Sequence, residues 1–242
     1  MNEINNIQYK MRSLFVEIKS NLDYLKQIKH EYKTKVDNSL VTQSDILVNS
    51  MIIDSINSIL HKIDKYYTLN LISEELHYDN TIDYNKGYTV IIDPIDGTEN
   101  FFSGMKEWGI CICLYKEGKH LYSTIMLPDL NIFIDSEETI NRFNKSRIIG
   151  LSSSLTLDDI KVLAANKQPD EEYRIIGCAA YNLYNYIIGA YKRFENVNGV
   201  NTWDISAGLN IMLNNELIPI VNGIEYTGEL LLPNTKYKLI LK

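Results

Sequence analysis

The order of the expected elements predicts a layered fold of mixed α/β or α+β class. Two stretches with helical spacing of apolar residues come first, short β-branched and apolar runs follow, and helix-like and strand-like segments alternate towards the C-terminus. This succession is typical of sheets that are covered by helices. With 242 residues, the chain is long enough to bury a sizeable core, as one large domain or two fused halves.

Apolar residues at intervals of three and four predict two helices near the N-terminus. The first spans residues 4–28. The second begins after Thr42 and Asp45, which resemble a capping box, and continues to residue 63. The segment between the two helices, residues 31–41, is polar and is expected to be a loop.

The middle of the chain carries four short apolar runs that are predicted to be strands. Residues 88–92 are β-branched, and Pro94 is expected to end this strand because it cannot donate to a sheet ladder. Residues 108–115 and 120–127 flank a short turn, which is the pattern of a β-hairpin. Residues 131–135 offer one further strand.

A polar, serine-rich stretch at residues 141–158 marks a boundary between two halves. We therefore divide the chain into residues 1–148, with the N-terminal helices and an antiparallel sheet, and residues 149–242, an α/β half. The elements expected beyond the boundary are strands at 160–164, 191–195, 217–221 and 237–241, and helices at 178–190 and 203–215.

The charge of the chain argues against some classes of partner. The formal net charge is −7 and the isoelectric point is about 5.2, and there is no run of five or more basic residues. Proteins that bind nucleic-acid polymers or anionic membranes usually present a basic face. We therefore expect neither partner, and an anionic small substrate would need local positive charge.

The cysteine count and the apolar patterning indicate where the protein works. Three cysteines are too few, and odd in number, for a disulfide framework, which favours a reducing compartment. The N-terminal segment lacks the uninterrupted apolar region of a signal peptide, and no stretch approaches 18 uncharged apolar residues. The expectation is a soluble cytoplasmic protein.

The strongest chemical signal is the segment Asp93-Pro-Ile-Asp-Gly-Thr98, which places two carboxylates at the end of a buried strand. Two such charges about 4 Å apart repel by roughly 4 kcal/mol at an effective dielectric near 20. A proton, a cationic side chain or a metal ion relieves this repulsion. The nearest basic residues in the sequence are Lys86 and Lys106, neither of them adjacent. Oxygen ligands select Mg²⁺ or Mn²⁺, and the N–H groups of Gly97 and Thr98 at a helix start suit an anion. The pattern points to a metal–phosphate site, against the alternative of a turn with two capping aspartates.

Two further segments accompany this one, Ile72-Ser-Glu-Glu75 and Trp203-Asp-Ile-Ser-Ala-Gly208. Together with Asp93-Pro-Ile-Asp-Gly-Thr-Glu-Asn-Phe101, they resemble the three signatures of the inositol monophosphatase family, part of the metal-dependent, lithium-sensitive sugar phosphatase superfamily. The resemblance spans roughly residues 5–222. It implies a layered αβαβα sandwich of the inositol monophosphatase and fructose-1,6-bisphosphatase type.

The resemblance also implies a set of metal and catalytic residues, most of them in the N-terminal half. The metal ligands would be Glu74, Asp93, Asp96, Asp204 and the backbone carbonyl of Ile95. The residues that act on the attacking water would be Asp45, Glu74 and Thr98. Two or three Mg²⁺ ions are expected, with Mn²⁺ as a substitute and Li⁺ as an inhibitor. Asp45 has a structural alternative, since it would also cap its helix.

The substrate residues implied by the resemblance come partly from the segment Arg174-Ile-Ile-Gly-Cys-Ala-Ala180. They are Asp96, Gly97, Thr98, Gly177, Cys178, Ala179, Glu195 and Asp204. Cys178 replaces the usual hydroxyl residue and has the alternative of an apolar filler. Residues 196–201 form a longer link than usual, which weakens the placement of Glu195, and a charge at a strand edge is its alternative.

The resemblance implies a Mg²⁺-dependent phosphomonoesterase that hydrolyses a small phosphorylated polyol, inositol 1-phosphate or a related sugar phosphate. A metal-activated water would attack directly, and a homodimer is expected. A first alternative is a 3′(2′),5′-bisphosphate nucleotidase, although Asp-Gly-Thr-Glu-Asn-Phe is nearer the inositol-type pattern. A second alternative is a non-catalytic scaffold that binds sugar phosphates. The Gly-x-Ser-x-Gly and His-Glu-x-x-His motifs of other hydrolases are absent from the sequence.

Overall fold

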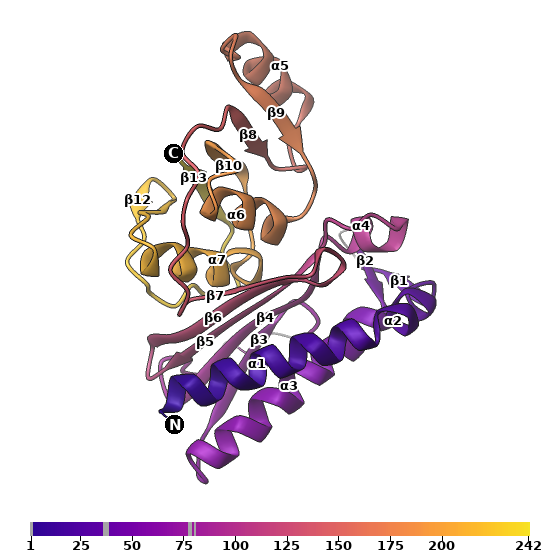
Figure 1. The fold of residues 1–242 in the computed structure, drawn as a ribbon, viewed down its shortest axis with the longest axis vertical. Coiled ribbons are helices and arrows are strands. Elements are labelled where there is room, and N and C mark those ends of the chain that lie inside the picture. Colours follow the sequence, from indigo (N-terminus) through magenta and orange to yellow (C-terminus); the bar gives the residue numbers. More distant parts are fainter. Residues whose placement is uncertain (1, 36–38, 77–78, 80) are drawn as a thin grey trace.

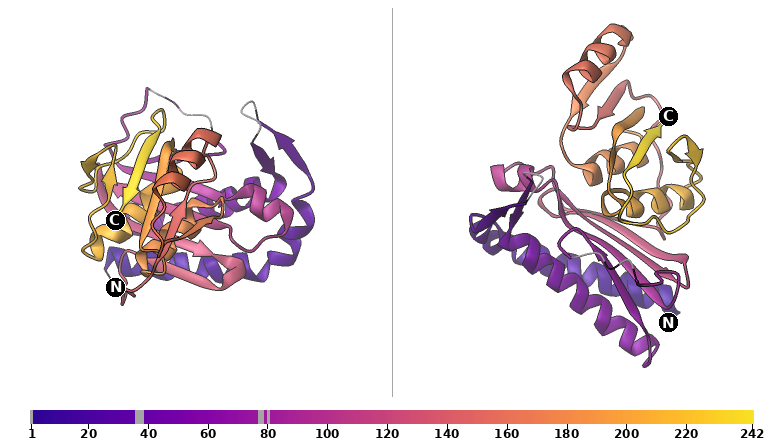
Figure 2. Two further views of the ribbon diagram at one scale, coloured as in Figure 1. Left: turned by 90° about the horizontal axis from the view of Figure 1, so that it is seen from above. Right: turned by 180° about the vertical axis from the view of Figure 1, so that it is seen from behind.

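A computed structural model describes residues 2–35, 39–76, 79 and 81–242, and it confirms the layered fold of mixed class. A five-stranded and a six-stranded sheet alternate with layers of helices (Figure 1). Seen from behind, α5 lies at the opposite end of the molecule from α1 and α3 (Figure 2). In the described part of the chain, every helix is too short or too polar to cross a membrane.

The first layer consists of α1 (Glu3–Ser20) and α3 (Gln43–Ile63), which pack on one face of the first sheet. The single helix expected at residues 4–28 is wrong, because a break at Asn21 separates α1 from α2 (Leu22–Ile28). The backbone N–H and the side-chain amide of Asn21 both donate to the Glu17 carbonyl and so cap the end of α1. The capping box at the start of α3 is confirmed.

The loop expected at residues 31–41 is also wrong at its two ends. β1 (Tyr32–Thr34) and β2 (Leu40–Thr42) pair in antiparallel register. Aromatic and β-branched residues favour extended backbone, and such residues occur in both strands. This two-stranded hairpin projects beside the N-terminus of α3.

The first sheet has the strand order β3-β4-β5-β6-β7. Its strands are β3 (Leu69–Ser73), β4 (Tyr88–Asp96), β5 (Gly109–Lys116), β6 (Lys119–Leu127) and β7 (Ile132–Asp135). The β3–β4 pair is parallel and the others are antiparallel, including the predicted β5–β6 hairpin. Two short helices flank these strands, α4 (Thr98–Ser103) and the 3₁₀ turn η1 (Pro128–Leu130).

Pro94 does not end its strand, contrary to the sequence prediction. β4 continues to Asp96, and its pairing with β5 shifts register between Asp93 and Asp96. A proline cannot donate to the ladder, so the strand accommodates it as an irregularity rather than a stop. The irregularity brings both aspartates to the end of a fully buried strand.

The second sheet has the strand order β12-β11-β13-β10-β8-β9. Its strands are β8 (Ile148–Leu151), β9 (Glu172–Ile175), β10 (Arg193–Val200), β11 (Ile220–Val221), β12 (Ile224–Glu225) and β13 (Tyr237–Leu241). The strand expected at residues 160–164 is wrong, because this segment belongs to α5 (Leu157–Asn166). A capping box between Thr156 and Asp159 starts this helix, and the apolar residues inside it remain partly or largely exposed.

The helices α6 (Ala179–Ile187) and α7 (Thr202–Asn214) lie between the two sheets. The first sheet separates the interior into two cores. One core lies between α1, α3 and the first sheet, and the other lies between that sheet, α6, α7 and the second sheet. Because α6 and α7 pack on the first sheet, the division into residues 1–148 and 149–242 stays a prediction.

Replacement of Gly189 by alanine should destabilise the protein by about 2–3 kcal/mol. Gly189 follows α6, with φ +78°, and a Cβ there would lie 1.7 Å from the Phe143 carbonyl oxygen. The segment around Phe143 would therefore have to leave the end of α6, where its N–H donates to the Ile188 carbonyl. Urea unfolding measures the change.

The matched control is Gly104→Ala, because Gly104 has φ +84° and no atom lies within 4 Å of the place that its Cβ would take. This variant bears the backbone strain without the collision, and we expect a loss of about 1 kcal/mol. Equal losses for the two variants would contradict the packing explanation.

Candidate active site

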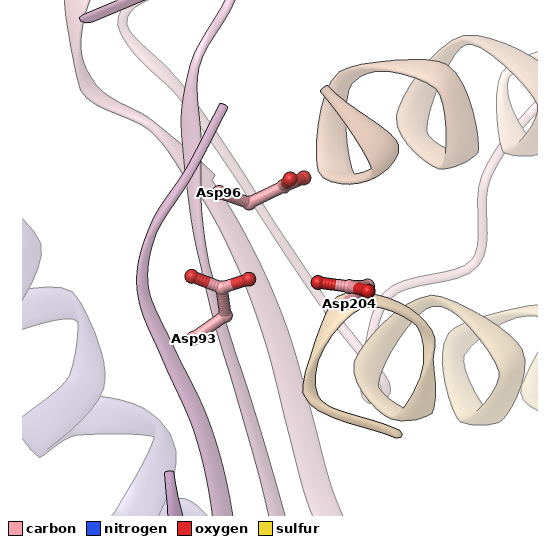
Figure 3. Close-up of side chains that lie close together, drawn as sticks. All are labelled: Asp93, Asp96 and Asp204. Carbon is pink, nitrogen blue, oxygen red and sulfur yellow. The ribbon is translucent and has the colours of Figure 1, made fainter. Parts of the chain in front are cut away.

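Three aspartates from distant parts of the sequence converge at one point (Figure 3). Asp93 and Asp96 come from the end of β4, and Asp204 comes from the first turn of α7. One carboxylate oxygen of each lies within 4.8 Å of an oxygen of the others. The backbone N–H of Asn201 donates to Asp204 Oδ2 at 2.7 Å and fixes the third carboxylate.

Asp93 has the least compensated carboxylate of the three. It is fully buried, and neither of its oxygens has a hydrogen-bond partner in the described part of the chain. Burial, followed by the charges of Glu74, Asp96 and Asp204, raises its pKa well above the usual range. A buried charge without a partner is unfavourable. A hard divalent cation fits this all-oxygen set, since it would supply the missing partner.

Asp96 joins the first sheet to α6. Its Oδ2 accepts hydrogen bonds from the Ala180 N–H and from the Cys178 thiol, the latter at 3.2 Å. Burial raises the pKa of Asp96 to about 6, and the hydrogen bonds oppose this rise. Burial also raises the pKa of Asp204 to about 7, together with the charges of Asp96 and Glu74. Ionisation of each carboxylate is therefore less favourable here than in water.

Glu74 lies near this group but outside its closest contacts. Its Oε1 is 2.8 Å from the Lys35 ammonium, which also lies 2.8 Å from Glu75 Oε1. Lys35 follows β1, so its proximity to Glu74 and Glu75 could not be inferred from the sequence around Asp93. Burial raises the pKa of Glu75 to about 7, against the hydrogen bond from Lys35.

Asp45 and Thr98 contact each other across the site. The Thr98 hydroxyl lies 3.3 Å from Asp45 Oδ1 and 2.9 Å from the Ile95 carbonyl oxygen. Asp45 is fully buried, and its Oδ2 accepts a hydrogen bond from the Thr42 N–H at 2.8 Å. Burial raises the pKa of Asp45 to about 6. Asp45 therefore caps α3 with one oxygen and faces Thr98 with the other.

A cavity of about 200 Å³ opens beside the aspartates. Among the expected substrate residues, those that line it are Asp96, Gly177, Cys178, Ala179 and Asp204. Gly97 and Thr98 lie outside the lining, although a Cβ on Gly97 would come within 2.9 Å of the Cys178 Cβ. The remaining polar lining was missed from the sequence and comprises Ser152, Ser153, Ser154, Asn182, Asn196 and Lys236.

Glu195 does not line this cavity, so its role as a substrate residue stays a prediction. Its carboxylate lies 2.7 Å from the Arg193 guanidinium and borders a separate cavity beneath α5. Successive side chains of a strand point to opposite faces, so Asn196 faces the active-site cavity in its place. The alternation of β10 was the signal that could have identified Asn196.

Without a divalent cation, stability should fall as the pH rises from about 4 to about 7. In the folded state the raised pKa values of Asp96 and Asp204, about 6 and about 7, keep protons that the unfolded chain releases near pH 3.8. Their contribution is therefore complete below about pH 4 and is lost as the pH passes about 7. Urea unfolding between pH 4 and pH 8 in a chelator measures this slope.

Asp204→Asn should flatten that slope, because the amide can still accept from Asn201 but does not ionise. The control is Asp158→Asn, whose carboxylate is 88% exposed, and it should keep the wild-type slope. An unchanged slope in Asp204→Asn would contradict the repulsion inferred for the three aspartates.

Comparison with known proteins places these residues in a family. The model of the inositol monophosphatase family matches residues 2–213. A fructose-1,6-bisphosphatase/inositol-1-monophosphatase of Thermotoga maritima is 27% identical over 186 residues, which cover 72% of this chain and 68% of that relative. Shorter matches include inositol monophosphatase 2 of Saccharomyces cerevisiae, 32% identical over 38% of this chain and 30% of the relative. A further one is 3′(2′),5′-bisphosphate nucleotidase 1 of Candida albicans, 26% identical over 42% of this chain and 29% of the relative.

Solved structures share the fold over nearly the whole chain. A Ca-bound IMPase family protein from Staphylococcus aureus has a TM-score of 0.75 and 18% identity, and the match covers 100% of this chain and 92% of that one. An IMPase/NADP phosphatase complexed with Mg²⁺ and phosphate has a TM-score of 0.74 and 18% identity, with 99% and 91% covered. The expected sandwich type is confirmed. The chain therefore belongs to the inositol monophosphatase family and is a phosphoric monoester hydrolase.

Proposed function

We propose that this protein hydrolyses the phosphate ester of a small polyol, inositol 1-phosphate or a related sugar phosphate, in a Mg²⁺-dependent reaction. The observation that carries the proposal is the Asp93 carboxylate, which is fully buried, has no hydrogen-bond partner among the described residues and lies within 4.8 Å of two further aspartates. Such a group needs a cation, and the two neighbouring aspartates, Asp96 and Asp204, line a cavity. A cation next to a cavity is the arrangement that an anionic substrate requires.

The residues that would hold two or three Mg²⁺ ions are Glu74, Asp93, Asp96, Asp204 and the carbonyl of Ile95. Bound ions would lower the pKa of a water molecule and offset the negative charge of the phosphate. Glu74 would join this set if an ion took the place of the Lys35 ammonium beside its carboxylate. Substitution by Mn²⁺ and inhibition by Li⁺ are predictions that rest on the family resemblance.

Asp45 and Thr98 would together orient the attacking water and accept its proton. Asp45, with a pKa raised to about 6, is largely ionised at neutral pH and can accept a proton. Its Oδ1 faces the Thr98 hydroxyl at 3.3 Å, so Thr98 can accept a hydrogen bond from the water while it donates to Asp45. Glu74 would orient the same water. The N–H groups of Gly97 and Thr98 would bind the phosphate.

The cavity supports a polyol as the leaving group. Its volume of about 200 Å³ is below the roughly 300–1,000 Å³ typical of sites for drug-sized ligands. Its wall away from the aspartates presents hydroxyl and amide groups beside the apolar side chains of Phe194 and Val200. A compact group with several hydroxyls suits this wall better than an adenine ring, which would need a broad apolar face.

One observation favours a second candidate, a substrate with two phosphates. Lys236 lines the cavity and brings a positive charge to it. Matching relatives include fructose-1,6-bisphosphatases and 3′(2′),5′-bisphosphate nucleotidases. Turnover of inositol 1-phosphate, fructose 1,6-bisphosphate and adenosine 3′,5′-bisphosphate, measured side by side, discriminates these substrates. The Asp45–Thr98 contact speaks against a non-catalytic scaffold.

The homodimer and the cytoplasmic location remain predictions that rest on the resemblance and the composition. Sedimentation of the purified protein, with and without Mg²⁺, tests the first. Fractionation of the source cells tests the second.

Asp93→Asn should lower phosphate release from inositol 1-phosphate at saturating Mg²⁺ by at least about a thousandfold, because the amide carries no charge for the cation. The fold should survive, since an amide has nearly the same shape as the carboxylate and relieves its repulsion. The malachite-green assay measures release, and thermal unfolding measures the fold.

The matched control is Asp158→Asn, which removes an exposed carboxylate far from the cavity and should keep wild-type turnover. Turnover of Asp93→Asn within tenfold of the wild type would reject the proposed site. Wild-type protein that releases no phosphate from any small monoester with Mg²⁺ would reject the proposed function.

A further inference from the structure

We propose that Asn182 selects the substrate by hydrogen bonding to a hydroxyl group of the leaving polyol. This inference rests on the proposed function and assigns a specificity-determining residue to it. Asn182 belongs to none of the three signature segments, and its side chain lines the cavity beside Asp96 and Asp204.

The position of Asn182 is fixed by the same turn that holds Asp96. It lies in the first turns of α6, where its backbone N–H donates to the Cys178 carbonyl. The thiol of Cys178 and the N–H of Ala180 bind the Asp96 carboxylate. The backbone at Asn182 is therefore anchored to the turn that binds Asp96, and an anchored backbone favours a defined position for the side chain relative to the proposed metal ligands.

The side-chain oxygen of Asn182 is buried without a partner. Asn182 is only 2% exposed, and its Oδ1 accepts no hydrogen bond in the described part of the chain. An unsatisfied buried acceptor costs free energy that a leucine at this position would avoid. A ligand in the cavity that donates a hydrogen bond removes this cost.

Three other polar residues of the cavity wall are engaged with one another. The Ser152 hydroxyl lies 2.8 Å from that of Ser154 and accepts from the Asn196 amide at 2.9 Å. Asn196 Oδ1 in turn accepts from the Gly199 N–H at 3.0 Å. Asn182 adds to this wall a buried acceptor that none of these three residues engages.

The chemistry of an amide identifies the ligand group. An asparagine side chain both accepts and donates hydrogen bonds, and it carries no charge. A hydroxyl group is its complement, because it also donates and accepts. Charged phosphate groups are served by the proposed ions and by Lys236 instead. The structure thus assigns Asn182 to an uncharged hydroxyl of the part of the substrate that leaves.

The test compares two substrates in the Mg²⁺-loaded protein, inositol 1-phosphate and phenyl phosphate, which has no hydroxyl on its leaving group. Asn182→Leu keeps the shape and removes the amide. It should lower kcat/KM for inositol 1-phosphate roughly tenfold to a hundredfold. The value for phenyl phosphate should stay within twofold, because that ester makes no use of the amide.

The matched control is Asn185→Leu, one turn further along α6. The Asn185 amide donates to the Tyr181 carbonyl at 2.8 Å and does not line the cavity. Asn185→Leu should change kcat/KM for both substrates by the same factor. Monodeoxy analogues of inositol 1-phosphate supply the second arm. With the wild-type protein, one analogue should show a kcat/KM as low as that of inositol 1-phosphate with Asn182→Leu. With Asn182→Leu, the same analogue should show no further fall in kcat/KM.

The outcomes separate this inference from the proposed function. Equal losses of kcat/KM for both substrates would indicate a packing role and overturn the inference about Asn182. Unchanged kcat/KM for both would indicate that the amide binds only water and would overturn it too. If Asn182→Leu does not fold, the wild-type deoxy series decides, and an unaffected series overturns the inference. If the protein hydrolyses phenyl phosphate but Asn182→Leu does not distinguish the two esters, only the role proposed for Asn182 is rejected. If the protein hydrolyses neither ester, the phosphatase proposal is rejected as well.

Discussion

The mutual repulsion of buried carboxylates is the constraint on which the rest of the site depends. Among the described residues, Asp93 has no hydrogen-bond partner, and Asp96 and Asp204 have only hydrogen bonds to offset their burial. The surrounding layers hold these groups together and keep water away from β4, which is buried along its whole length. Charges held in such a place lower the stability of the fold. A cation converts this cost into binding free energy, so the fold is prepared for an ion rather than stabilised by its own charges.

The site is also the place where both halves of the chain meet. Asp96 belongs to the first sheet, yet its hydrogen bonds come from the start of α6. Asp204 belongs to α7, which packs on that sheet. The β1–β2 hairpin adds Lys35, whose ammonium holds Glu74. Three distant segments must therefore be in place before the carboxylates can share an ion, which ties the chemistry to the completed tertiary fold.

Local patterns predicted what depends on local physics. Helical spacing identified the segments of α1 and α3, and the paired carboxylates of β4 followed from a short motif. The errors lie where distant contacts decide. Glu195 was placed by the family resemblance, but strand alternation directs its side chain to a separate cavity. Asn182 and Lys35 gave no local signal, since their roles arise only from neighbours that are far away in sequence.

This separation has a consequence for specificity. The signature segments supply the carboxylates, and the matching relatives carry names of several different substrates. The cavity wall opposite them comes from other segments, after β8, along β10 and in α6. Ser152, Ser154 and Asn196 of this wall bond to one another rather than to the acidic group, so they can change without disturbing the three aspartates. The signature segments alone therefore do not name the substrate.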